Sequence, residues 1–73
     1  MRIVYDPEVD ALYIRFLDER VQVTTHRLSE EVAVNYAPDG KIVGIEVLDA
    51  SESVFHSRVK PKVEVKNLEA VVT

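Results

Sequence analysis

The sequence contains no cysteine, and it has only two glycines and three prolines among its 73 residues. The absence of cysteine excludes disulfide bonds and every thiolate metal site. The scarcity of glycine and proline excludes a flexible linker or a collagen-like chain. We therefore expect residues 1–73 to form one domain without covalent cross-links.

A long apolar run is also lacking. No stretch approaches the roughly 20 residues that a membrane-spanning helix needs. Near the N-terminus, Asp6, Glu8 and Asp10 interrupt the apolar segment that a secretory signal would require. The sequence therefore predicts a cytoplasmic protein that does not enter the membrane.

The short chain limits the size of the core. A domain of this length buries only about 60% of the surface that it exposes when unfolded. Small domains compensate with disulfides, a structural metal or association. The two histidines, His26 and His56, are thirty residues apart and lack metal-ligand spacing. Association with another protein chain is therefore the remaining source of extra stability, and we expect a homodimer or a bound protein partner.

The net charge of −4 is unevenly distributed. Residues 1–55 contain five basic and eleven acidic residues, a balance of −6, whereas residues 56–73 contain four basic and two acidic residues, a balance of +2. An acidic body disfavours nucleic-acid binding, which depends on neutralising phosphates. It is compatible with a small basic protein as partner.

Valine and isoleucine are abundant, which favours strands over helices. Alternating apolar and polar residues predict strands over residues 2–5, 11–17, 21–28, 32–37 and 41–48, and a last strand around Val63 and Val65. Short polar breaks, such as residues 18–20, separate the predicted strands. The fold class that we expect is α+β, mainly β: an antiparallel meander sheet of about 4–6 strands with one short helix near residues 50–57.

Two local patterns refine this expectation. Asp39-Gly40 between two alternating segments predicts a two-residue hairpin turn. Asp49 or Ser51 is a candidate N-cap for the short helix, which would bury Val54 and Phe55 and end before Pro61.

The candidate chemical groups are sparse. Asp6, Glu8 and Asp10 resemble the start of a calcium loop, but the glycine and the distal glutamate of such a loop are missing, so a solvated turn is favoured. His26 lies near Thr24 and Thr25, yet nothing activates these hydroxyls. No phosphate-binding loop or catalytic triad motif is present. We therefore expect no enzyme activity, no cofactor and no metal.

Interface residues are more plausible than catalytic ones. Tyr13 and Arg15 share one face of their predicted strand, and tyrosine and arginine are enriched in interface cores, although tyrosine also suits any half-buried strand. The apolar residues near the C-terminus offer a second docking element. Our interface candidates are Tyr13, Arg15, Val63, Val65, Leu68 and Val71.

Two segments of the sequence resemble a known prokaryotic family. They are Tyr5-Asp6-Pro7-Glu8-Val9-Asp10-Ala11-Leu12-Tyr13-Ile14 and Gly40-Lys41-Ile42-Val43-Gly44-Ile45-Glu46-Val47-Leu48-Asp49-Ala50-Ser51. The family is catalogued as domain of unknown function 2283, and the resemblance covers about residues 2–53, leaving residues 54–73 as a C-terminal extension. It implies no catalytic residues.

The motif residues also have a physical interpretation. A short acceptor at Asp10 can bond backbone donors where the first turn ends, and Gly44 inside a strand predicts a bulge or a close approach by a backbone or ring.

Some members of the family have a genomic setting similar to that of antitoxins, beside small proteins of a basic ribonuclease-toxin type. Our leading hypothesis is therefore a protein-interaction module that is the antitoxin-like partner of such a toxin. The alternative is a self-associating homodimer with a structural or small-ligand role, in which residues 59–73 are exchanged or packed between subunits. A metal-dependent hydrolase that uses the acids of the first turn is the third hypothesis.

Overall fold

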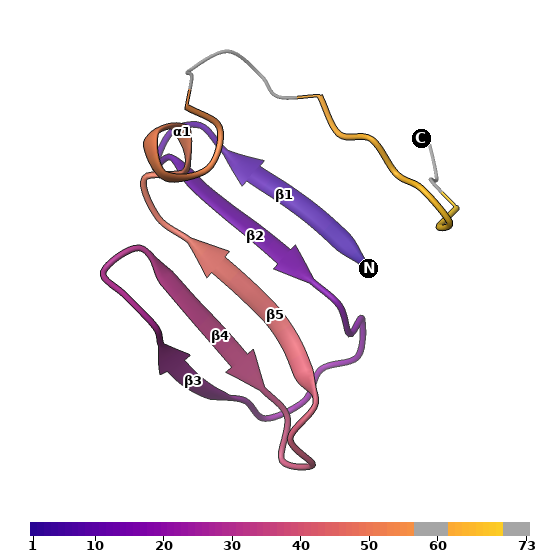
Figure 1. Ribbon diagram of the computed structural model, residues 1–73. Coiled ribbons are helices and arrows are strands. Elements are labelled where there is room, and N and C mark those ends of the chain that lie inside the picture. The colour runs from indigo at the N-terminus through magenta and orange to yellow at the C-terminus, as the bar shows by residue number, and fades with distance from the viewer. Residues whose placement is uncertain (57–61, 70–73) are drawn as a thin grey trace.

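A single antiparallel β-sheet forms the body of the protein (Figure 1). The computed structural model describes residues 1–56 and 62–69. The elements in chain order are β1 (Arg2–Asp6), β2 (Ala11–Arg15), β3 (Thr24–Arg27), β4 (Val32–Tyr36), β5 (Ile42–Val47) and α1 (Ala50–Ser53). The predicted fold class, mainly β with one short helix, is confirmed.

The strand order is β1-β2-β5-β4-β3, which departs from a simple meander at one point. The break at residues 18–20 is not a hairpin, because residues 16–23 run past the ends of β5 and β4 to the far edge (Figure 1). The side chains explain this order. β5 contributes the buried Val43 and Val47 and lies in the centre of the sheet, whereas all four residues of β3 are exposed, as suits a short edge strand.

Two predicted strands differ from the structure by more than two residues. The third is shorter than expected and begins at Thr24 rather than at residue 21. The prediction of a last strand around Val63 and Val65 is wrong, because residues 62–66 have no regular secondary structure. A strand needs a hydrogen-bonded neighbour, and within the described ranges β1 pairs with β2 alone.

The turn between β4 and β5 contains three residues instead of the predicted two. The Ala37 N–H donates to the Lys41 carbonyl at 2.8 Å, and the Gly40 N–H donates to the Ala37 carbonyl at 2.9 Å. Gly40 has φ 87°, and Asp39 is not among the residues with positive φ. This is the three-residue hairpin loop in which only the last position is left-handed.

The strand register assigns each side chain to one of two faces. One face, here called the helix face, carries Ile3, Tyr5, Leu12, Ile14, Val32, Val34, Ile45 and Val47. The other, here called the open face, carries Arg2, Val4, Tyr13, Arg15, Thr25, Arg27, Ala33, Asn35, Gly44 and Glu46.

The helix α1 packs on one end of the helix face. Its Ala50 is fully buried against Leu12 and Val47, and the ring of Phe55 meets that of Tyr5 edge to face at 5.0 Å. The predicted buried pair is thus half correct, because Phe55 packs but Val54 is 42% exposed.

The predicted helix end is also too late. α1 ends at Ser53, where Val54 takes a non-helical conformation. Pro61, which was expected to stop the helix, lies outside the described residues. Across residues 1–56 and 62–69, no helix has the length and apolar character needed to cross a membrane.

Candidate functional site

Two segments that are distant in sequence meet at the end of the sheet that carries α1. The carboxylate of Asp10 accepts hydrogen bonds from the Tyr5 hydroxyl at 2.6 Å, from the Ser51 N–H at 2.9 Å and from the Ser51 hydroxyl at 2.6 Å. The Asp10 carbonyl also accepts the Ala50 N–H at 2.9 Å. Ser51 is only 2% exposed, so these bonds satisfy groups that water does not reach.

Asp10 therefore caps α1 from another part of the chain. Asp49 occupies the N-cap position, but its φ is 50° and its side chain makes no capping bond, so the expected cap is corrected to Asp10. The expectation that Asp10 bonds backbone donors is confirmed, and the donors belong to the helix. The pairing with Ser51 could not be derived from local spacing, because 41 residues separate the two positions.

The same bonds bear on the cation hypothesis for the first turn. The Asp6 carboxylate accepts the Glu8 N–H at 3.0 Å, and the Asp10 carboxylate accepts the hydroxyls of Tyr5 and Ser51. In the part of the chain that the structure describes, no three acidic, histidine or cysteine side chains are grouped as metal ligands. The Asp6 carboxylate thus makes a local bond and the Asp10 carboxylate caps the helix.

A second polar cluster crosses the open face. The Asn35 amide donates to the Tyr13 hydroxyl oxygen at 3.4 Å, and the Thr25 hydroxyl donates to the Asn35 carbonyl oxygen at 2.6 Å. Asn35 is 7% exposed. The predicted interface candidate Tyr13 is therefore part of a row that ties β2, β4 and β3 together across β5.

Gly44 makes this row possible. A Cβ atom at position 44 would lie 2.7 Å from the Tyr13 hydroxyl oxygen and 2.9 Å from the Ile14 carbonyl oxygen. The expected close approach of a ring to this glycine is confirmed. A register shift between Asn35 and Tyr36 lies beside it, where Tyr36 faces Ile42 and Asn35 faces Gly44.

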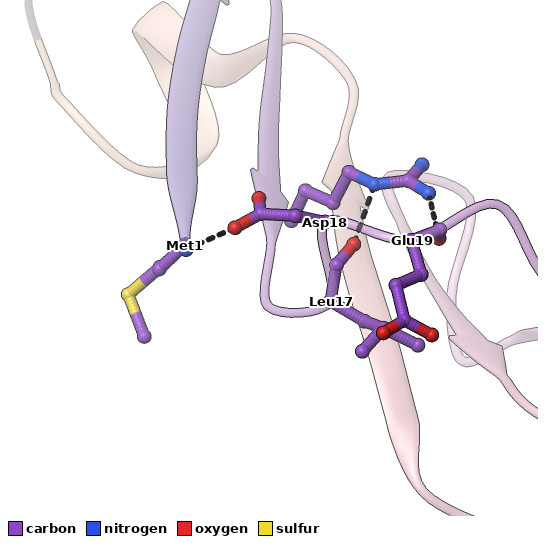
Figure 2. A network of polar contacts seen from close by, with 5 residues as sticks. Met1, Leu17, Asp18 and Glu19 are labelled. Atoms are coloured by element: carbon purple, nitrogen blue, oxygen red, sulfur yellow. Dashed lines mark hydrogen bonds and ion pairs between the residues drawn. The ribbon is translucent and has the colours of Figure 1, made fainter.

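Arg15, the second candidate on β2, binds the chain that follows it. Its guanidinium donates to the Leu17 carbonyl at 2.6 Å and to the Glu19 carbonyl at 2.8 Å, as Figure 2 shows. In the same view, the N-terminal ammonium of Met1 lies 3.5 Å from the Asp18 carboxylate. Arg15 thereby fixes the exit of β2, where the chain turns toward the far edge.

The remaining interface candidates lie elsewhere. Val63, Val65 and Leu68 line a groove of about 610 Å³ together with Met1 and Ile3 at the outer side of β1. Neither Tyr13 nor Arg15 lines this groove, so the structure places the candidates in two separate groups. Val71 lies outside the described residues.

His26 lies on the helix face of the sheet. It pairs with Val34, and its ring meets that of Tyr36 edge to face at 5.6 Å. All of β3 is exposed, which makes His26 a surface residue of the helix face.

The fold also separates the charges. The end of the sheet that carries α1 is here called the acidic end. Within residues 1–56, Arg27 is the one basic residue there. The acidic residues at this end are Asp6, Glu8, Asp10, Glu30, Glu31, Asp49 and Glu52. The opposite end is mixed and holds Arg2, Arg15, Arg20 and Lys41 beside Asp18, Glu19 and Asp39. The acidic excess of the body therefore belongs to one end of the molecule.

Comparison with known proteins agrees with the two motif segments. The model of the family described as "Protein of unknown function (DUF2283)" matches residues 2–51, which contain all five strands and the start of α1. No curated protein and no solved structure matches the chain. Because the match covers more than half of the sequence and includes Tyr5, Asp10, Gly44 and Ser51, the chain belongs to the DUF2283 family.

Proposed function

We propose that this protein is an interaction module that binds a small basic protein of the ribonuclease-toxin type and thereby acts as its antitoxin. The observation that carries the proposal is the acidic end, where seven acidic residues stand against one arginine within residues 1–56. A ribonuclease must hold RNA phosphates with basic residues. A surface that offers carboxylates instead competes for the same residues.

The acidic side chains are available for such a partner. Asp6, Glu8, Glu30, Asp49 and Glu52 are all exposed. The Arg27 guanidinium is directed at the Ser29 and Glu30 carbonyls, where it neutralises little of the carboxylate charge beside it. Complementary charge mainly raises the association rate and excludes wrong partners.

Apolar contact area remains exposed on the helix face, toward the end of the sheet opposite these charges. The helix α1 has four residues and covers one end of the helix face, and Ile3 remains 49% and Phe16 38% exposed. Stable interfaces combine an apolar centre with a polar rim. The helix face and the acidic end together supply both components.

The test is co-expression with the product of the neighbouring gene, which the proposal expects to be a small basic protein, followed by measurement of association kinetics at two salt concentrations. The decisive variant is Glu30→Lys/Glu31→Lys at the acidic end. Its matched control is Asp18→Lys/Glu19→Lys, which reverses two adjacent acids in a loop at the opposite end.

We expect a complex with the native protein, and an association rate reduced by about tenfold or more by the Glu30/Glu31 reversal at low salt. The control reversal should leave the rate within about twofold of the native value. Absence of a complex, or equal effects of the two reversals, would refute the proposal.

A further inference from the structure

The outer edge of β1 has a residue pattern that is complementary to itself. β1 reads Arg2-Ile3-Val4-Tyr5-Asp6 and is an edge strand, paired with β2 on one side and with no other strand of the described chain. Ile3 and Val4 are 49% and 44% exposed. An edge of this kind presents unpaired backbone donors and acceptors to any strand that approaches it.

The complementarity follows from a two-fold axis placed at Val4. In an antiparallel pair of identical strands about this axis, Val4 lies opposite Val4 of the second copy, Ile3 opposite Tyr5, and Arg2 opposite Asp6. Each of the last two pairs occurs twice, since a two-fold interface repeats every contact. Directly opposed side chains of opposite charge favour pairing, and like charges oppose it.

The faces of the sheet remain consistent across such a junction. The register with β2 places Ile3 and Tyr5 on the helix face and Arg2, Val4 and Asp6 on the open face. The Ile3–Tyr5 pairs would therefore continue the apolar side of the sheet into the second copy. The two Arg2–Asp6 pairs would flank the Val4–Val4 contact on the other side.

We infer that a second copy of this chain docks at β1, so that two five-stranded sheets join edge to edge into one continuous antiparallel sheet. The charge complementarity of β1 identifies this occupant. The groove at the same edge is lined by Met1 and Ile3 and by the chain's own segment from Val63 to Glu69, which includes the charged Glu64, Lys66 and Glu69. The incoming strand would therefore contact this segment as well as β1.

The other edge of the sheet lacks this property. β3 is Thr24-Thr25-His26-Arg27, with no acidic residue. Pairing with a second copy about His26 would place Arg27 opposite Thr25, and pairing about Thr25 would place His26 opposite Thr24. Neither arrangement opposes unlike charges, so β1 is the edge that selects a second copy.

The experiment is a charge exchange on the full-length protein, read as mass by light scattering or sedimentation across micromolar to millimolar concentrations. Arg2→Glu and Asp6→Lys each turn two attractive pairs into two repulsive ones. The double variant Arg2→Glu/Asp6→Lys restores attraction with the signs exchanged. We expect a native dimer, a dimer dissociation constant raised by about tenfold or more in each single variant, and a value within about threefold of native in the double variant.

Asp6 also accepts the Glu8 N–H, so Asp6→Lys affects the first turn as well as the interface. Val4→Lys provides an independent variant, because it places two like charges at the axis on a side chain that is 44% exposed. It should dissociate the dimer while circular dichroism remains native. Lys41→Glu, at the exposed residue that closes the β4–β5 turn, is the matched single-charge control and should leave the dimer intact.

A native protein that is monomeric throughout this range would overturn the inference. A dimer whose dissociation constant is unchanged by Arg2→Glu and by Val4→Lys would also overturn it. The same holds for a folded double variant whose dissociation constant remains as high as those of the single variants. The proposed toxin-binding surface shares Ile3 and Asp6 with this edge, but the dimer test uses the protein alone, and Glu30 and Glu31 lie at the opposite edge of the sheet. Failure of one proposal is therefore distinguishable from failure of the other.

Discussion

Asp10 and Ser51 are 41 residues apart in the sequence, and the carboxylate of the first accepts both the N–H and the hydroxyl of the second, at 2.9 and 2.6 Å. This pair joins the first turn of the protein to the start of α1. Asp10 has φ 54°, a conformation that aspartate tolerates better than most residues because its short side chain can bond locally. The family motifs around positions 10 and 51 thus encode one structural junction.

The first prediction concerns this junction. Asp10→Asn keeps a residue that tolerates positive φ, but it removes the charge and one of the two acceptor oxygens. We expect the free energy of unfolding to fall by about 1–3 kcal/mol, because a donor of the buried Ser51 loses its acceptor. Urea denaturation followed by circular dichroism measures the change.

Glu8→Gln is the control, since Glu8 is exposed in the same turn, and it should change the stability by less than about 0.5 kcal/mol. A double-mutant cycle with Ser51→Ala should give a coupling energy of about 0.5–3 kcal/mol. Strictly additive effects would show that the two side chains do not stabilise each other.

The second prediction concerns Gly44. Gly44→Ala places a Cβ 2.7 Å from the Tyr13 hydroxyl oxygen and 2.9 Å from a backbone oxygen, so either the ring or the strand must shift. We expect a loss of about 1–3 kcal/mol. In a Tyr13→Phe background the same substitution should cost less, because the nearest atom is gone. Equal costs in both backgrounds would contradict the close approach as the cause.

The third prediction separates backbone strain from crowding in the β4–β5 turn. Gly40 has φ 87°, and nothing lies within 4 Å of the position that a Cβ would take. Gly40→Ala should therefore cost about 1–2 kcal/mol through conformation alone. Gly40→Asn should cost clearly less, since asparagine enters the left-handed region more readily. Thermal unfolding of the two variants tests the order, and a lower melting temperature for the asparagine variant would refute it.

The fourth prediction concerns the polar row on the open face. Asn35→Ala removes the acceptor of Thr25 and the donor to Tyr13 from a position that is 7% exposed. The expected loss is about 1–3 kcal/mol, whereas Thr25→Val, on the exposed β3, should cost less than about 1 kcal/mol. A chemical-denaturation series gives both values. Comparable losses for the two variants would mean that the Thr25–Asn35 bond supplies most of the stabilisation and that the Asn35–Tyr13 bond adds little.

Much of the local structure could be predicted because the alternation of side chains has the period of a strand. Leu12 and Ile14, and likewise Val32 and Val34, reveal their buried face without reference to any partner. The prediction of the last strand used the same alternation as the others, and it was wrong. Val63 and Val65 alternate correctly, but alternation only permits a strand, and a hydrogen-bonded neighbour is needed to form it.

The candidate sites were harder to derive. Tyr13 and Arg15 were singled out by residue type, yet their contacts with Asn35 and with the Leu17 and Glu19 carbonyls depend on which strands become neighbours. Gly44 was an exception, because a glycine inside a strand already indicates that something approaches its backbone closely.

Five of the six predicted strands, the mainly β class and the family resemblance follow from local periodicity and from two short motifs. The strand order, the capping of α1 by Asp10 and the gathering of acids at one end of the sheet are visible only in the folded chain. The physical reason is the same in each case. These features arise between residues that are far apart in the chain, and their relative positions are set by which apolar faces pack together and which strands pair.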